Sequence, residues 1–304
     1  MNPFRQQDLT EYLERIYASY HHPRFLYADP LALVHEFSTP EDQEVAALFA
    51  ALLAYGQVGQ ILKDLRDLYE RMDWQPAAFV RDFQPRDAIR RLEDFKHRFT
   101  EGEDLAAMCA LLHRFTRKAS LEARFRECVD ERDVDLAPAL DRFVGRLLDE
   151  PLPRGYNKER ILAKHSFKHL VPRPAAGSAC KRWFLFLRWV VRPRDGIDLG
   201  LWPSVSPSKL LMPLDSHIRR ITANLGLLEG SSASLKAARK VTEAFRQISP
   251  HDPTRYDFAL CHLGILQECP TQPSLRACAA CELKPVCKLC GALTRQQRSL
   301  NRAY

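Results

Sequence analysis

Apolar residues recur at helical spacing along most of this chain, and that repeat limits the folds open to it. Thr39 followed by Pro40 predicts the start of one helix, because threonine caps the first turn well and proline is preorganised for it. Gly56 is expected to end or bend that helix, and a second helix is expected to follow. The apolar faces consist of Val45, Leu48, Phe49, Leu52 and Leu53, then Val58, Ile61, Leu62, Leu65 and Leu68.

Similar stripes run through the middle and the end of the chain, at 103–116, 119–129, 135–148, 180–191, 215–225, 234–247 and 254–267. No segment alternates convincingly between apolar and polar residues, as a half-buried strand does. The sequence therefore predicts an all-α fold, and 304 residues are enough for one large core or two modest ones in contact.

The composition of the chain limits which binding partners and which cellular location we expect. With 45 Lys and Arg against 38 Asp and Glu, the net charge is +7, which is compatible with a polyanionic partner. No apolar run approaches the roughly 20 residues of a membrane-spanning helix, and the first residues lack the apolar stretch of a secretory signal. We therefore expect no membrane partner and a cytoplasmic location. The acid-free tail after Cys287, with Lys288, Arg295, Arg298 and Arg302, indicates either a phosphate contact or a solvated terminus.

The nine cysteines fall into two groups. Four are scattered among apolar neighbours and are expected in the core: Cys109, Cys128, Cys180 and Cys261. Five lie within 22 residues near the end: Cys269, Cys278, Cys281, Cys287 and Cys290. Because a reducing cytosol keeps thiols free, clustered cysteines there are typical metal ligands rather than disulfide partners.

Four thiolates can hold either a [4Fe–4S] cluster or a zinc ion. Only five residues separate Cys281 from Cys287, whereas zinc ribbons place on the order of 12–20 residues between their cysteine pairs. This spacing favours an iron–sulfur cluster on Cys269, Cys278, Cys281 and Cys287, with zinc and no metal as alternatives. Cys290 is then a spare thiol.

The order Cys, longer gap, Cys-x-x-Cys, five residues, Cys resembles the C-terminal cluster loop of endonuclease III and the related adenine glycosylases, which are helix-hairpin-helix DNA glycosylases. The resemblance implies a structural [4Fe–4S] cluster whose neighbours Lys284 and Lys288 contact DNA phosphates. The first gap, eight residues, is longer than in that family, and this leaves Cys290 as a possible replacement for Cys269.

Two further segments match the family by position. Asp215, just before an apolar helix, is a good N-cap residue on its own, and its segment also resembles the Val-Asp-Thr-His segment that carries the catalytic aspartate. Upstream, Gly177 precedes a helix whose first turns hold Lys181 and Arg182. A lysine there is typically a solvated residue, but Lys181 matches the nucleophilic lysine of bifunctional members. The family's compact Gly-x-Gly turn is missing, since only Gly177 is near, and Gly177 and Arg182 are expected to contact DNA.

The resemblance implies a glycosylase and AP lyase acting on double-stranded DNA with a damaged base. Lys181 and Asp215 are 34 residues apart, which is similar to the archaeal 8-oxoguanine glycosylases, so oxidised guanine is the expected substrate. Gln57 resembles the glutamine that family members insert into DNA. Two alternatives stay open, namely a non-catalytic iron–sulfur DNA-binding protein and a zinc-stapled helical scaffold.

The implied fold has two helical lobes, one formed by 1–40 with 156–304 and the other by 41–155. The sequence leaves the roles of several aromatic residues undecided between core packing and chemistry: Trp183, Trp189, Trp202, His217 and His262.

Overall fold

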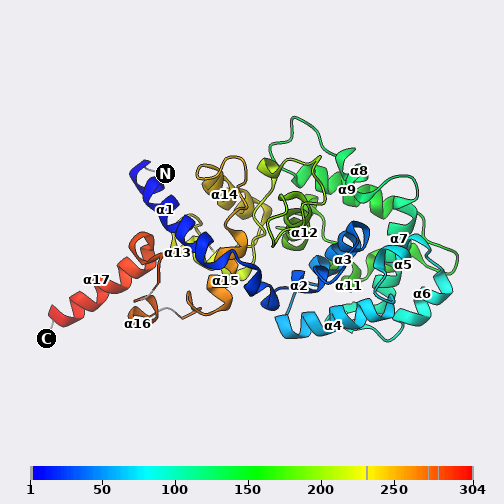
Figure 1. The fold of residues 1–304 in the computed structure, drawn as a ribbon, viewed down its shortest axis with the longest axis horizontal. Helices are drawn as coiled ribbons and strands as arrows, with labels where there is room; N and C mark the ends of the chain where they lie inside the picture. Colours follow the sequence, from blue (N-terminus) through cyan, green and yellow to red (C-terminus); the bar gives the residue numbers. More distant parts are fainter. Residues whose placement is uncertain (1–2, 231, 273, 280, 303–304) are drawn as a thin grey trace. The chain divides into compact units, whose positions relative to one another are not determined.

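The chain folds almost entirely into helices (Figure 1). The structure is a computed structural model that describes residues 3–230, 232–272, 274–279 and 281–302, with only the backbone of residues 3–7 and 296–302. Within these ranges the only strands are β1 (Lys96–His97) and β2 (Thr100–Glu101), which pair as an antiparallel hairpin. The predicted all-α class is confirmed. No helix among the described residues is long and apolar enough to cross a membrane.

Two compact units make up the chain. Unit 1 consists of Met1–Phe25 with Pro207–Tyr304, and unit 2 of Leu26–Ser206. A discontinuous division was expected from the sequence, with boundaries at residues 40 and 155. The observed boundaries differ, because segments 26–40 and 156–206 belong to unit 2 together with 41–155.

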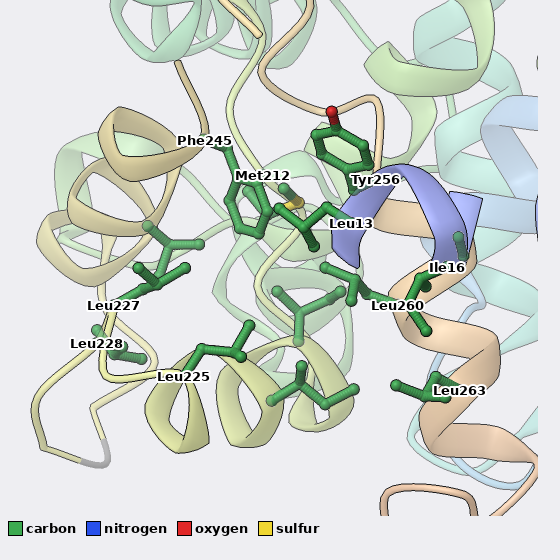
Figure 2. Packing of buried hydrophobic residues seen from close by; sticks show 14 of the residues in the cluster. Leu13, Ile16, Met212, Leu225, Leu227, Leu228, Phe245, Tyr256, Leu260 and Leu263 are labelled. Atoms are coloured by element: carbon green, nitrogen blue, oxygen red, sulfur yellow. The ribbon is translucent and has the colours of Figure 1, made fainter. Parts of the chain in front are cut away.

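Unit 1 packs the beginning of the chain against its last third. Helix α1 lies beside α15, and α15 also contacts α13 (Figure 1). Figure 2 shows Leu13 and Ile16 of α1 meeting Leu260 and Leu263 of α15 in the core of this unit. The helices of unit 1 are α1 (Pro3–Tyr20), α13 (Ser216–Asn224), α14 (Leu235–Arg246), α15 (Asp257–Ile265), α16 (Leu275–Cys278) and α17 (Lys288–Arg302), with short 3-10 turns η3 (Pro207–Lys209) and η4 (Lys284–Val286).

Unit 2 is built around two buried helices, α3 (Pro40–Leu52) and α12 (Lys181–Val191), which pack on each other. The remaining helices of the unit are α2 (Leu31–Val34), α4 (Val58–Arg71), α5 (Pro76–Arg81), α6 (Pro85–Leu92), α7 (Gly102–Thr116), α8 (Leu121–Arg126), α9 (Ala137–Asp149), α10 (Lys158–Ala163) and α11 (His165–Leu170), with the 3-10 turn η2 (Pro174–Ala176). A further 3-10 turn, η1 (Pro23–Ala28), spans the boundary between the units.

The predicted start of α3 is confirmed in detail. Thr39 has extended backbone angles, and its hydroxyl accepts a hydrogen bond from the Asp42 amide at 3.2 Å. The helix ends at Leu52, and Gly56 follows with a φ of +110°, a conformation that favours glycine. The tryptophans left undecided above prove to be core residues, since Trp183, Trp189 and Trp202 are fully buried.

Candidate functional site

The five clustered cysteines converge on one cavity of unit 1, between the end of α13 and the segment that leads into α17. The cavity holds about 430 Å³ free of atoms, part of which is open to solvent. All five line it: Cys269, Cys278, Cys281, Cys287 and Cys290. Four of these thiols are partly buried and Cys290 is fully buried. Residues spread over 22 positions of the sequence therefore line a common space.

Burial and the charges of neighbouring cysteines raise the pKa of three of these thiols. Burial, followed by the charges of neighbouring cysteines, raises the pKa of Cys281 to about 11. Burial likewise raises the pKa of Cys278 and that of Cys287. A bound metal cation would supply the positive charge that thiolates need at this place.

Hydrogen bonds from α13 and α17 reach two of the sulfur atoms. The side-chain amide of Asn224, the last residue of α13, donates to Sγ of Cys269 at 3.7 Å. The backbone amide of Cys290 points at Sγ of Cys287 at 3.5 Å. Such donors are typical around cluster sulfurs, where they tune the electronic properties of the group.

Thiolates gathered at one place can hold two kinds of group. Zinc draws four sulfurs onto one ion, about 3.8 Å from each other for a Zn–S bond of about 2.3 Å. In a [4Fe–4S] cluster each thiolate binds a different iron, so that the sulfurs lie farther apart. Among the described residues no group of three or more His, Cys, Asp or Glu side chains is arranged so that it could hold a metal ion.

Lys284 lines this cavity, and other cationic side chains lie on the segments that carry its cysteines. Lys284 and Lys288 are exposed, as is Arg276. Lys288 lies directly on Gly226, since a Cβ added at Gly226 would come within 2.4 Å of the lysine Cδ. The two lysines expected to contact phosphate are therefore accessible to a ligand. Arg298 and Arg302 of the basic tail lie outside the residues whose side chains are described.

Asp215 has the expected position at the start of α13. Its Oδ1 accepts a hydrogen bond from the Ile218 amide at 2.7 Å, which confirms the capping role. Its Oδ2 accepts one from Sγ of Cys261 at 3.3 Å. Cys261 was expected to be a buried core thiol, but it is only partly buried, unlike Cys109, Cys128 and Cys180, which are fully buried as predicted.

Two histidines near Asp215 have packing roles. His217 lies against Gly264 of α15, where an added Cβ would come 2.9 Å from the histidine Cβ. His262 is fully buried and bonds through its two ring nitrogens to the carbonyls of Phe258 and Phe25, each at 3.0 Å. These contacts fix α13 and α15 within unit 1.

Lys181 is the first residue of α12 in unit 2 and is partly buried. Its Nζ donates to the carbonyl oxygen of Ala54, just beyond the end of α3, at 3.3 Å. The connection before it contains Gly177 with a φ of +75° and Cys180 with a φ of +43°. Cβ atoms are tolerated around Gly177, since nothing lies within 4 Å of the added atom, so its backbone angle explains the glycine there. The irregular connection agrees with the missing Gly-x-Gly pattern.

Arg182 departs from its expected role. Its side chain is buried, and the guanidinium donates to the backbone carbonyls of Leu52 and His169. It also lies over the ring of Tyr55, 4.9 Å from the centroid. These bonds argue against a phosphate contact and make Arg182 a positioning residue, one that ties α11 and the end of α3 to α12. Sequence periodicity missed this, because α12 is buried on almost all sides rather than on one face.

Gln57, the expected inserting residue, is exposed in the turn between α3 and α4. Its side chain makes no capping hydrogen bond within the described residues. The same turn, Ala54–Gln57, contacts Lys181 on one side and the β1–β2 hairpin on the other, where Arg98 lies over Gly56. We call this region the turn surface: Tyr55, Gly56, Gln57, Arg98, Phe99 and Lys181. The structure thus places Lys181 against the start of the turn that carries Gln57.

Comparison with known proteins places the chain in a family. A family model described as "Protein of unknown function (DUF2400)" matches residues 29–266. The chain belongs to this family. The segment of the chain that the family model matches includes Gln57, Lys181 and Asp215. It ends before Cys269, so the five clustered cysteines lie outside it. No curated protein and no solved structure matches the chain.

Proposed function

We propose that this chain is a bifunctional DNA glycosylase that excises an oxidised guanine such as 8-oxoguanine from double-stranded DNA and then nicks the strand. The observation that carries the proposal is the environment of Lys181. Its amine lies at the start of a buried helix against Ala54, within three residues of the exposed Gln57. A partly buried lysine with no ion pair among the described residues is suited to act as a nucleophile rather than as a structural cation.

In this proposal the Lys181 amine attacks C1′ of the damaged nucleotide. The bond between C1′ and the base breaks, and the base leaves with the bonding electrons and takes up a proton. The attached amine loses one proton, the C1′–O4′ bond breaks as O4′ takes up a proton, and a protonated Schiff base results. Removal of a C2′ proton then expels the 3′ phosphate and nicks the strand.

Asp215 is assigned to the charge that this reaction develops. Breaking a glycosidic bond builds positive charge on the sugar, and a fixed carboxylate stabilises it. The cap at Ile218 holds one carboxylate oxygen of Asp215 in place. The other oxygen accepts a hydrogen bond from the thiol of Cys261, a weak donor that a stronger one easily displaces.

The cysteine cavity is assigned to a [4Fe–4S] cluster with a structural role. The group would staple the segment after α15 to α13 and α17, and so hold Lys284 and Lys288 toward a polyanion. The ligands are proposed to be Cys269, Cys278, Cys281 and Cys287.

The test is a nicking assay with the purified full chain. Two duplexes that differ only in one base, guanine or 8-oxoguanine, are incubated with the protein. The DNA strands are then separated by size, with and without alkali treatment. The proposal predicts cleavage of the 8-oxoguanine duplex without alkali, and no cleavage by Lys181→Ala. Cleavage that survives in Lys181→Ala, or no cleavage of any oxidised-guanine duplex, would overturn it.

A second candidate is a non-catalytic iron–sulfur protein that binds DNA. The hydrogen bonds of Asp215 favour this second candidate, because both carboxylate oxygens already accept hydrogen bonds from groups within the chain. This alternative predicts tight, salt-sensitive DNA binding with no base release and no nicking.

A further inference from the structure

The tip of the β1–β2 hairpin presents an aromatic ring to solvent. Arg98 and Phe99 form the two-residue turn between the strands. The Phe99 side chain is 48% exposed, one of few large apolar side chains so placed among the described residues. Arg98 has a φ of +53°, although the first position of such a turn favours glycine. A strained turn that exposes an aromatic ring gains little for stability, so binding is the better explanation.

Other rings lie beside Phe99, and together with it form what we call the aromatic surface: Phe99, Tyr55, His165 and His169. The ring of Tyr55 is parallel to that of Phe99 within 5°, with centroids 6.3 Å apart. His169 and His165 meet Phe99 edge to face, at 5.3 and 6.1 Å. Burial, followed by the charge of Arg182, lowers the pKa of His169 to about 4, so this ring is neutral at neutral pH. The rings hold Phe99 from the side and leave part of it free.

The charge around the aromatic surface is suited to a polyanion. Arg98, Lys96 and Lys168 are exposed and form no ion pair within the described residues. The carboxylates nearby are already paired. Lys164 contacts Glu101, Glu103 and Asp104 at 3.0–3.2 Å, and Asp64 bonds to the His97 ring at 2.7 Å. Free cations beside an exposed ring match a phosphate beside a base.

The geometry points to a nucleobase-stacking site, in which Phe99 stacks on an unpaired base of DNA and Arg98 contacts an adjacent phosphate. The inference rests on the DNA-binding part of the proposed function. It adds a residue that sequence reasoning missed, since a hairpin with strands of two residues leaves no alternation to read. The ring would face the bases next to Gln57, whose turn Arg98 contacts. Stacking suits this place because every base has an aromatic face and the hairpin offers no base-reading pocket.

The test uses the full chain and two DNA duplexes, one with a single bulged 2-aminopurine and one fully paired. We expect Phe99→Ala to weaken binding of the bulged duplex by roughly tenfold or more, as for loss of one base–aromatic stack. Binding of the paired duplex is expected to be unchanged. Phe99→Trp should restore the preference for the bulge, whereas Phe99→Leu, which keeps an apolar side chain, should not.

Tyr27→Ala is the matched control, because Tyr27 is also an exposed aromatic of unit 2, at 66%. Equal binding of the bulged duplex by Phe99→Leu and wild type, or an equal loss for both duplexes in Phe99→Ala, would overturn the inference. The proposed chemistry is judged separately. Nicking that depends on Lys181 without any effect of Phe99 leaves the function standing, and Phe99-dependent bulge binding without nicking leaves this site standing. No DNA binding at all would overturn both.

Discussion

The side-chain amide of Asn224 donates to Sγ of Cys269, and nine residues earlier on the chain Asp215 caps the same helix. Helix α13 therefore carries the proposed charge-stabilising carboxylate at one end and contacts the cysteine cavity at the other. Arg220, in between, donates to the carbonyl of Cys269 at 2.6 Å. Loss of a group bound in the cavity is thus expected to disturb the helix that positions Asp215.

The ligand set of the cavity can be tested by single substitutions. We expect Cys269→Ala, Cys278→Ala, Cys281→Ala and Cys287→Ala to lose iron and the brown visible absorption, because each removes one of four thiolates. Cys290→Ala should keep both. Iron and acid-labile sulfide analysis of the purified proteins is the measurement. A colourless wild type with stoichiometric zinc would contradict the cluster, and retention of iron by Cys269→Ala with loss by Cys290→Ala would exchange these two ligands.

Asp215 combines capping with a proposed chemical role, and two substitutions separate them. Asparagine caps a helix as well as aspartate, so Asp215→Asn should melt close to wild type, while nicking should fall by about 10²–10³-fold with the charge gone. Asp215→Ala should in addition lose about 1 kcal/mol of stability. Ser234→Ala, which removes the cap of α14, is the control that costs stability without affecting nicking. Full activity in Asp215→Asn would leave capping as the only role.

The hairpin that carries Phe99 depends on Gly102. A Cβ there would lie 1.6 Å from the backbone carbonyl oxygen of Leu92, so the backbone itself has to shift. Gly102→Ala is expected to lower the free energy of unfolding by about 1–3 kcal/mol or more. Gly59→Ala, in α4 with open space around the added atom, should instead raise it by about 0.5–1 kcal/mol. Urea denaturation of both variants checks the difference, and equal effects would show that the Gly102 contact is unimportant.

Glu44 predicts a pH dependence of stability. Burial raises the pKa of Glu44 to about 7, although Trp202 Nε1 donates to its carboxylate at 2.6 Å. The folded state then binds a proton that the unfolded state releases near pH 4.5, so this residue's contribution is fully present below about pH 4.5 and is lost as the pH rises through about 7.

Replacement by glutamine keeps an acceptor for Trp202 and removes the titration. The stability of Glu44→Gln minus that of wild type should therefore be larger at pH 8 than at pH 5. Each pH unit between the two pKa values corresponds to about 1.4 kcal/mol. Melting temperatures at the two pH values give the comparison. A difference between wild type and Glu44→Gln that is the same at both would refute it.

The periodicity of apolar residues identified helices that carry many apolar residues on one face, and it missed others. The stripes at 103–116 and 234–247 became α7 and α14 almost residue for residue. Helix α1 was missed, although Leu9, Leu13, Ile16 and Tyr20 have helical spacing and are buried. The spacing of the cysteines predicted a shared site. All five cysteines line the cavity, and spacing alone cannot tell which four of them would act as ligands.

The turn surface was only partly predictable. Gln57 and Lys181 were predicted as site residues from their positions, whereas Phe99 and Arg98 gave no signal, because their turn lacks the glycine that usually marks a two-residue hairpin. Arg182 was misread, because its hydrogen-bond partners at Leu52 and His169 are distant in sequence.

The central claim is that Lys181 is the nucleophile, and borohydride trapping tests it most directly. Full-length protein is incubated with an 8-oxoguanine duplex, treated with borohydride, and examined for a covalent protein–DNA adduct. Lys181→Arg preserves the positive charge, and Lys118→Ala removes an exposed lysine of unit 2 just beyond α7 as the matched control. The account predicts an adduct in wild type and Lys118→Ala and none in Lys181→Arg, whereas an undiminished adduct in Lys181→Arg, or none in wild type despite DNA binding, would contradict it.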